Sequence, residues 1–291
     1  MKPAIKSEVF FDGFTTSPRL AHPEGVAVHP DGSVWCGSED GKIFRVSPDG
    51  ASHTVVADLD GFTLGIAFDD DANLYVCHLD KSNVLRLGAK DFVAQPLFSD
   101  GEGPSVPNFA VIDHFRNRLL VSDSQRLPHS YPSIWQVGLD GSSAKPWLTE
   151  PIDFANGMAL SRDARTLFVA GSWEHAVYRV SIDDEGKAGQ LEKFVEHIPG
   201  IPDGLAVTVD NQLVIGCYEP SVVLLVDQTG KVTELLRDDT AHLMCHPTNI
   251  AFRGSDLFTA NLGRWHLTKI ETTLNGPPSS LPTEMVDPHD I

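Results

Sequence analysis

Cysteine is scarce in this chain of 291 residues, and the four that occur are Cys36, Cys77, Cys217 and Cys245. They lie far apart, without the CxxC spacing of zinc and redox motifs. Three of them fall in apolar segments that we expect to be strands. This distribution predicts buried free thiols in a reducing compartment, and therefore a cytoplasmic protein.

Positive charge is also lacking: 22 Lys and Arg face 40 Asp and Glu, which gives a formal net charge of -18. Such an acidic surface argues against nucleic acids and anionic membranes as partners, and is compatible with a cation site. No apolar run reaches the length needed to span a bilayer. The first residues lead into a charged segment rather than the apolar core of a signal peptide.

Helical periodicity is absent as well, and short apolar runs separated by turn residues take its place. Residues 22–50 contain three such runs, which end at Pro30-Asp31-Gly32, at Glu39-Asp40-Gly41 and at Pro48-Asp49-Gly50. Runs of four to six β-formers cut by turn residues are typical of hairpins, so three in a row predict a meander.

The same pattern recurs six times along the chain, with copies 40 to 48 residues apart. Repeats of about this length, each long enough for four strands, are typical of propellers. The sequence therefore predicts an all-β, six-bladed β-propeller in a single domain over residues 1–291, and we expect a monomer. Each first strand begins at what we call a ring position, and the six are Glu24, Leu64, Asn108, Asn156, Asp203 and Thr248.

The outer strands carry the weakest signal. Residues 96–101 are expected to form the fourth strand of blade two, whereas the sixth copy has no fourth strand of its own. Residues 8–13 have the missing pattern, so we predict that the N-terminal segment pairs into the last blade and closes the ring. From about Asn275 the chain should run as a tail over the surface.

The ring positions predict a metal site. First strands line the central channel of a propeller, so these six residues should meet at its mouth. Two carboxylates and two amides converge there, with no Lys or Arg among them, and such a group is unfavourable unless a cation lies between the carboxylates. Oxygen ligands favour Ca²⁺, with Mg²⁺ or Mn²⁺ as alternatives. Zn²⁺ is less favoured because His and Cys are missing from these positions.

The chain resembles the gluconolactonase/regucalcin (senescence marker protein) family of six-bladed propellers over nearly its whole length. The motifs that carry the resemblance are His22-Pro-Glu24-Gly25, Phe154-Ala-Asn156-Gly157 and Ile201-Pro-Asp203-Gly204. The resemblance implies that Glu24, Asn156 and Asp203 hold a divalent metal. It also implies that Asn108 contacts substrate or water.

The activity implied by the resemblance is metal-assisted hydrolysis of a lactone, with Asp203 as the general base. Many sugar lactonases of the family carry an Arg two residues before the third-blade Asn, where this chain has Val106. We therefore expect a less hydroxylated lactone as substrate. Asn108 would orient the water or the substrate carbonyl.

Further substrate contacts are expected from loops at the mouth. Residues 123–132 form the longest of these loops and are a candidate lid. Its polar side chains Arg126 and His129 would compensate for Val106, while Trp173, Tyr218 and Asn261 come from other loops. For the two aromatic residues, packing between blades is the alternative interpretation, and for Asn261 it is a hydrogen bond within its loop.

Two other functions fit the same residues. One is a related metal-dependent esterase or phosphoesterase, because the same ion can polarise a phosphoryl oxygen. The other is a noncatalytic calcium-binding propeller, since propellers often serve as scaffolds. Lactone hydrolysis in the presence of metal would distinguish the enzymes from the scaffold.

Overall fold

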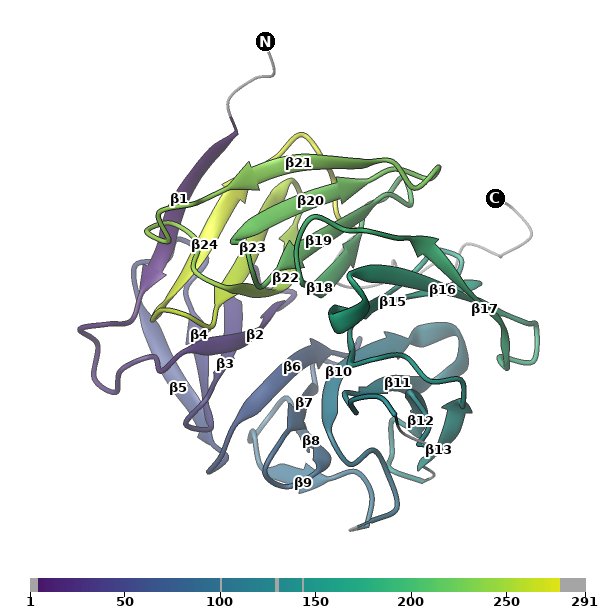
Figure 1. Cartoon of the computed structure of the whole chain (residues 1–291). Helices are drawn as coiled ribbons and strands as arrows, with labels where there is room; N and C mark the ends of the chain where they lie inside the picture. The colour runs from purple at the N-terminus through teal and green to yellow at the C-terminus, as the bar shows by residue number, and fades with distance from the viewer. Residues whose placement is uncertain (1–4, 100, 129–130, 143, 278–291) are drawn as a thin grey trace.

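The computed structural model describes residues 5–99, 101–128, 131–142 and 144–277. These residues form six sheets of four antiparallel strands, and Figure 1 shows the sheets arranged around a common centre. The six-bladed, all-β propeller predicted from the repeats is confirmed. The described residues contain no helix long and apolar enough to cross a bilayer.

Each of the first five blades consists of four consecutive strands, so one copy of the repeat makes one blade. Blade one contains β2 (Pro23–Val28), β3 (Val34–Ser38), β4 (Lys42–Val46) and β5 (His53–Asp58). Blade two contains β6 (Thr63–Phe68), β7 (Leu74–His78), β8 (Asn83–Leu87) and β9 (Ala94–Pro96). Blade three contains β10 (Pro107–Asp113), the 3-10 helix η1 (His114–Arg116), β11 (Arg118–Asp123), β12 (Ile134–Gly138) and β13 (Ala144–Leu148).

The second half of the chain repeats this order. Blade four contains β14 (Ala155–Leu160), β15 (Thr166–Gly171), the 3-10 helix η2 (Ser172–Glu174), β16 (Ala176–Ile182) and β17 (Ala188–Val195). Blade five contains β18 (Pro202–Val207), β19 (Leu213–Cys217), β20 (Val222–Val226) and β21 (Val232–Arg237). Blade six contains β22 (Pro247–Arg253), β23 (Asp256–Asn261), β24 (His266–Glu271) and the N-terminal strand β1 (Lys6–Asp12).

Strand β1 closes the ring, as predicted. It pairs antiparallel with β24, with Lys6 opposite Glu271 and Asp12 opposite His266 (Figure 1). Phe11 turns inward from β1 and joins the apolar core that includes Phe44 of blade one. Closure therefore buries apolar surface and also removes an open sheet edge.

The outer edge of blade two differs from the sequence-based expectation. Its fourth strand is β9, which ends at Pro96, and residues 97–99 and 101 are not part of it, while Asp100 lies outside the described residues. Leu97 and Phe98 are instead buried in the core shared with blade three. The Asn83 side chain holds this segment, because it donates to the carbonyl oxygen of Phe98 (2.9 Å) and accepts from the N–H of Leu97 (3.2 Å).

The start of the predicted tail is fixed by backbone hydrogen bonds. The N–H of Val209 donates to the carbonyl oxygen of Asn275 (2.8 Å), and the N–H of Gly276 donates to that of Gly254 (2.9 Å). The remainder, residues 278–291, lies outside the described residues.

All four cysteines are buried and free, as predicted. Burial raises the pKa of the Cys36, Cys77 and Cys217 thiols, so that they stay protonated at neutral pH. These thiols act as small apolar core residues.

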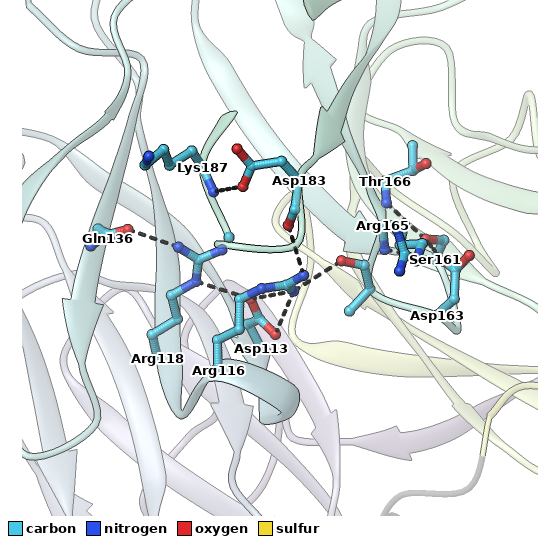
Figure 2. A network of polar contacts seen from close by, with 12 residues as sticks. Asp113, Arg116, Arg118, Gln136, Ser161, Asp163, Arg165, Thr166, Asp183 and Lys187 are labelled. Carbon is cyan, nitrogen blue, oxygen red and sulfur yellow. Dashed lines mark hydrogen bonds and ion pairs between the residues drawn. The ribbon is translucent and has the colours of Figure 1, made fainter. Parts of the chain in front are cut away.

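Blades three and four are joined by a polar network at the ends of their inner strands that lie away from the ring positions (Figure 2). The fully buried Asp113 carboxylate accepts from Arg118 Nε (2.9 Å) and Arg116 Nη1 (3.2 Å). Arg116 also donates to the carbonyl oxygens of Ala164 (3.1 Å) and Asp183 (3.2 Å) in blade four. The acid is thus paired with two cations, and one of them, Arg116, also holds the backbone of the neighbouring blade.

The closure can be tested with Phe11→Ala. Phe11 is 6% exposed, so the substitution leaves a cavity between β1 and its neighbours. We expect the free energy of unfolding to fall by about 3–5 kcal/mol, measured by urea denaturation. Val9→Ala on the same strand is the matched control, because Val9 is 40% exposed. Equal effects of the two substitutions would contradict the role of β1 in the core.

Candidate functional site

Every inner strand carries a β-bulge at its ring position. In blade one Pro23 pairs with Ser38 and Val26 with Cys36, so that three steps along β2 match two steps along β3. The same shift occurs in all six inner strands. A bulge bends the strand and re-aims a side chain. Five of the six ring side chains consequently reach one cavity.

The glycines that follow several ring positions let the inner strands approach closely. A Cβ on Gly25 would lie 2.2 Å from the carbonyl oxygen of Leu64, and one on Gly157 would lie 2.2 Å from that of Asp203. Real Cβ atoms do not come so close to a backbone oxygen, so only glycine fits at these places. The Glu-Gly and Asn-Gly pairs of the sequence therefore reflect the narrowness of the channel.

Side-chain hydroxyls connect neighbouring blades around the mouth. Thr248 donates to the carbonyl oxygen of Glu24 (2.8 Å), and Ser172 donates to that of Pro202 (2.7 Å). Ser172 also accepts from Asn156 Nδ2 (3.1 Å). These bonds fix both the backbone and the side-chain orientation of the ring residues.

The mouth of the channel is a cavity of about 460 Å³. Its polar side chains are those of Glu24, Asn108, Asn156, Ser172 and Asp203, with Tyr218 at the wall, and its apolar lining residues are Phe62, Leu64, Leu79, Val106, Phe154, Trp173, Ile201 and Leu262. This volume lies within the roughly 300–1,000 Å³ of small-molecule sites. A larger groove of about 700 Å³ lies beside Lys81 and Asn83 of blade two, away from the ring positions.

Two carboxylates share the floor of the cavity, where Glu24 is 3% and Asp203 7% exposed. Burial, together with the charge of Asp203, raises the pKa of Glu24 well above its usual range. Burial also raises the pKa of Asp203 to about 7, although a hydrogen bond from the Asn156 side chain lowers it. No basic side chain lines this cavity among the described residues, so two negative charges there need a counter-charge.

Four buried oxygen atoms at the mouth have no hydrogen-bond partner: Asn108 Oδ1, Asn156 Oδ1, Asp203 Oδ1 and Asn249 Oδ1. They are four of the six such side-chain atoms in the described part of the chain. Unpaired buried acceptors are costly, so their concentration at one place suits the binding of a group that accepts electron pairs. Carboxylate and amide oxygens are ligands for Ca²⁺ and Mg²⁺, so the residues fit a hard divalent cation.

The donor set does not favour Zn²⁺. Among the described residues no three side chains of His, Cys, Asp and Glu gather as a metal-binding group. The floor instead combines two carboxylates with amides, which are weak ligands for softer transition metals.

The structure brings most of the predicted site residues together. Glu24, Asn108, Asn156 and Asp203 lie on the floor of one cavity, and the remaining predicted residues in its wall are Val106, Trp173 and Tyr218. Trp173 packs against Phe154, with ring centroids 6.0 Å apart, and remains 45% exposed, so it is both a packing residue and part of the rim.

Three other predicted contacts lie elsewhere. Arg126 is outside the lining, where its guanidinium stacks on Trp173 (4.7 Å) and pairs with Asp153 (3.0 Å). His129 lies outside the described residues. Asn261 is fully buried inside blade six, where it accepts from the N–H of Cys245 (2.9 Å) and donates to the carbonyl oxygen of His266 (3.0 Å). It therefore stabilises the sheet and is not among the residues that line the cavity.

The candidate lid begins differently from the expectation. Asp123 is the last residue of β11, and its carboxylate accepts from the N–H groups of Ser105 (3.0 Å) and Val106 (2.9 Å). The N–H of Ser124 donates to the carbonyl oxygen of Val106 (3.0 Å). The base of the loop thus holds Val106 in place at the cavity wall.

Asn249 also supports the site, although its sequence position was not predicted to do so. It follows ring position Thr248, where four other blades have glycine, and its Nδ2 donates to Glu24 Oε2 (3.3 Å). The Asn249 side chain is fully buried. This departure from the repeat was the signal that could have identified it.

The fold and the cavity define a class of protein: a six-bladed propeller with carboxylates and amides at its mouth. Residues 122–261 match the family model for the SMP-30/Gluconolactonase/LRE-like region, and residues 16–46 match that for the strictosidine synthase-like N-terminal region. A gluconolactonase from Xanthomonas campestris superposes with a TM-score of 0.76 at 19% identity, covering 92% of this chain and 90% of that one. The calcium-binding protein regucalcin from Agrobacterium tumefaciens superposes with a TM-score of 0.75 at 17% identity, covering 96% and 97%.

Curated relatives match over shorter stretches. The adipocyte plasma membrane-associated protein of Salmo salar is 26% identical over 217 residues, which are 64% of this chain and 51% of that protein. The 6-deoxy-6-sulfogluconolactonase of Pseudomonas putida is 30% identical over 113 residues, 36% of each. The chain therefore matches about half or less of the length of these two relatives. The predicted resemblance to the gluconolactonase/regucalcin family is confirmed, with the family region at residues 122–261.

The buried carboxylates predict an unusual pH dependence of stability in the absence of divalent cations. Between pH 3.8 and about 7 the folded protein keeps a proton on Asp203 that the unfolded chain releases. The folded state binds more protons there, so this group makes the free energy of unfolding fall as pH rises. Urea denaturation in the presence of a chelator should show that the free energy of unfolding falls more steeply with rising pH in the parent than in Asp203→Asn. Saturating Ca²⁺ should reverse it, because the ion competes with the proton. Identical pH profiles for parent and variant would contradict this assignment.

The contact from Asn249 predicts an effect on metal affinity. Asn249→Ala removes the donor to Glu24, and loss of such a supporting hydrogen bond weakens metal binding by about 10–100-fold. Calorimetric titration with Ca²⁺ measures the change. Asn83→Ala is the matched control, because it removes a buried amide away from the cavity and should lower stability without altering Ca²⁺ affinity. Equal Ca²⁺ affinities in parent and Asn249→Ala would contradict the role of Asn249.

Proposed function

We propose that this protein is a divalent-cation-dependent lactone hydrolase, with Ca²⁺ as the first choice of ion. The observation that carries the proposal is the group of buried oxygen atoms without donors on the floor of a cavity of small-molecule size. The family region at residues 122–261 and the gluconolactonases among the relatives support the reaction class.

Glu24, Asn156 and Asp203 would hold the ion. They come from blades one, four and five, and the bulges aim all three into the same floor. When bound, a divalent ion there would balance the two carboxylates and withdraw electron density from the ester carbonyl. Asn249 and Ser172 then act as supports, because each bonds to the side chain of a residue that would hold the ion.

Asp203 is the group that can move a proton in this cavity. Its carboxylate takes a proton from a water molecule as that water adds to the ester carbonyl carbon. The bond between the carbonyl carbon and the ring oxygen then breaks, and the proton passes to the departing oxygen. The product is the open-chain hydroxy acid. Asn108, on the same floor, offers its amide group to orient the water or the carbonyl oxygen.

The alternatives are less well supported by the same cavity. A phosphoester carries negative charge beyond the two carboxylates that a divalent ion would balance, and the lining contains no Lys, Arg or His among the described residues to pair with it. A calcium-binding role without catalysis would require the oxygen ligands on the floor, but it would not require a cavity above them that can hold a small molecule. The cavity above the floor therefore favours an enzyme over a scaffold.

The proposal is tested with Asp203→Asn and a panel of γ- and δ-lactones. General acid–base catalysis contributes about 10²–10⁴-fold, so we expect kcat to fall by at least 100-fold. Chelator should abolish activity in the parent, and Ca²⁺ should restore it. Asp227→Asn is the control, because Asp227 accepts hydrogen bonds only within its own turn, from residues such as Thr229 and Lys231.

Ca²⁺ binding should be measured on the same preparations by calorimetry. A parent protein that binds Ca²⁺ but hydrolyses none of the lactones would overturn the enzymatic proposal and favour the scaffold. Full activity in the presence of chelator would overturn the metal dependence alone.

A further inference from the structure

The cavity is divided into a polar floor and an apolar wall. Above Glu24 and Asp203 the wall is formed mainly by carbon surface, including the side chains of Phe62, Leu79 and Val106. A ligand hydroxyl placed against this wall would leave water without gaining a hydrogen-bond partner. An alkyl or aryl group placed there would lose only its contact with water, which is favourable.

The charge of the cavity also limits which ligands can bind there. No cationic side chain lines it among the described residues. The nearby cation Arg126 is outside, where Asp153 pairs with it and Trp173 covers its face. A sulfonate, carboxylate or phosphate on the substituent would therefore lie against the wall without a cationic side chain to pair with it. The ligand that fits is neutral.

We infer that the substrate is a neutral lactone with an alkyl or aryl substituent, bound with its ester carbonyl at the floor and its substituent against the apolar wall. This inference rests on the proposed function, and adds to it the chemical class of the substrate. Hydrolysis converts the neutral lactone into a hydroxy acid, which is anionic at neutral pH.

Val106 is the wall residue best suited to a test. Its backbone is fixed by the hydrogen bonds to Asp123 and Ser124, so a substitution of similar shape changes the wall without moving the chain. Val106→Thr exchanges a methyl group for a hydroxyl and keeps the volume. The residue contacts the substituent equally in the bound substrate and in the transition state, so we expect KM to change and kcat to stay nearly constant.

The experiment uses γ-butyrolactones that share one ring and differ in the substituent. We expect kcat/KM to rise by up to about fourfold per methylene from methyl to pentyl. The hydroxymethyl lactone and the lactone bearing a γ-carboxylate should be poorer substrates than the propyl lactone by at least tenfold. Better hydrolysis of either polar lactone than of the pentyl lactone would overturn the inference and leave the proposed function intact.

The wall variant provides the second measurement. Val106→Thr should raise KM for the pentyl lactone by about threefold to tenfold, with Ca²⁺ affinity unchanged. The control is Val93→Thr, the same exchange at a residue that is 56% exposed on blade two, and it should change neither constant. An unchanged KM in Val106→Thr would show that the substituent does not lie against this wall.

A nonhydrolysable probe separates the inference from the proposed function. γ-Pentyl-γ-lactam keeps the ring and the carbonyl but resists hydrolysis, so its calorimetric affinity for the Ca²⁺-loaded protein reports binding alone. We expect it to bind at least tenfold more tightly than the γ-hydroxymethyl lactam. Selective binding of the pentyl lactam without turnover of any lactone would contradict the hydrolase and support the apolar ligand class. Equal binding of the two lactams would overturn the inference.

Discussion

The site depends on one backbone feature, the β-bulge at the start of every inner strand. A regular strand alternates its side chains between the two faces of its own blade. The extra residue in each bulge changes that alternation and aims a side chain at the cavity in five of the six blades. Residues that are 40 or more positions apart in the chain consequently meet on one floor. The bulges of the fold determine where these side chains point, and the residue type at each bulge determines what the site can bind.

The floor violates the rule that buried charges are paired. Glu24 and Asp203 are both buried there, and burial raises the pKa of each, with a further increase for Glu24 from the charge of Asp203. The buried Asp113, by contrast, is paired with Arg116 and Arg118 (Figure 2). The contrast is informative, because structural requirements do not demand two unpaired acids in a channel. Sites where a sequence breaks a local rule in this way are expected to be functional.

The blades and the floor could be predicted from the sequence because the repeat has a fixed phase. Once Glu24, Asn156 and Asp203 occupy the same position in their copies, the symmetry of the fold brings them together. Only part of the wall could be predicted, since Phe62, Leu79 and Leu262 come from connections whose paths differ between copies. Asn261 was misplaced for a related reason: the pattern gives its position in the blade but not the hydrogen bonds that turn it inward. No repeat signal pointed to the bulges themselves.

At the boundary between blades six and one, the same strands take part in closing the ring and in holding a residue of the site. Thr248 and Asn249 belong to β22, and both bond to Glu24 of blade one. Strand β22 lies in the sheet that β1 completes, so the N-terminal strand supports the sheet that holds Glu24. The other residues that would hold an ion, Asn156 and Asp203, come from adjacent blades made of continuous chain. Glu24 is therefore the member of the floor whose position depends on pairing between the two ends of the chain.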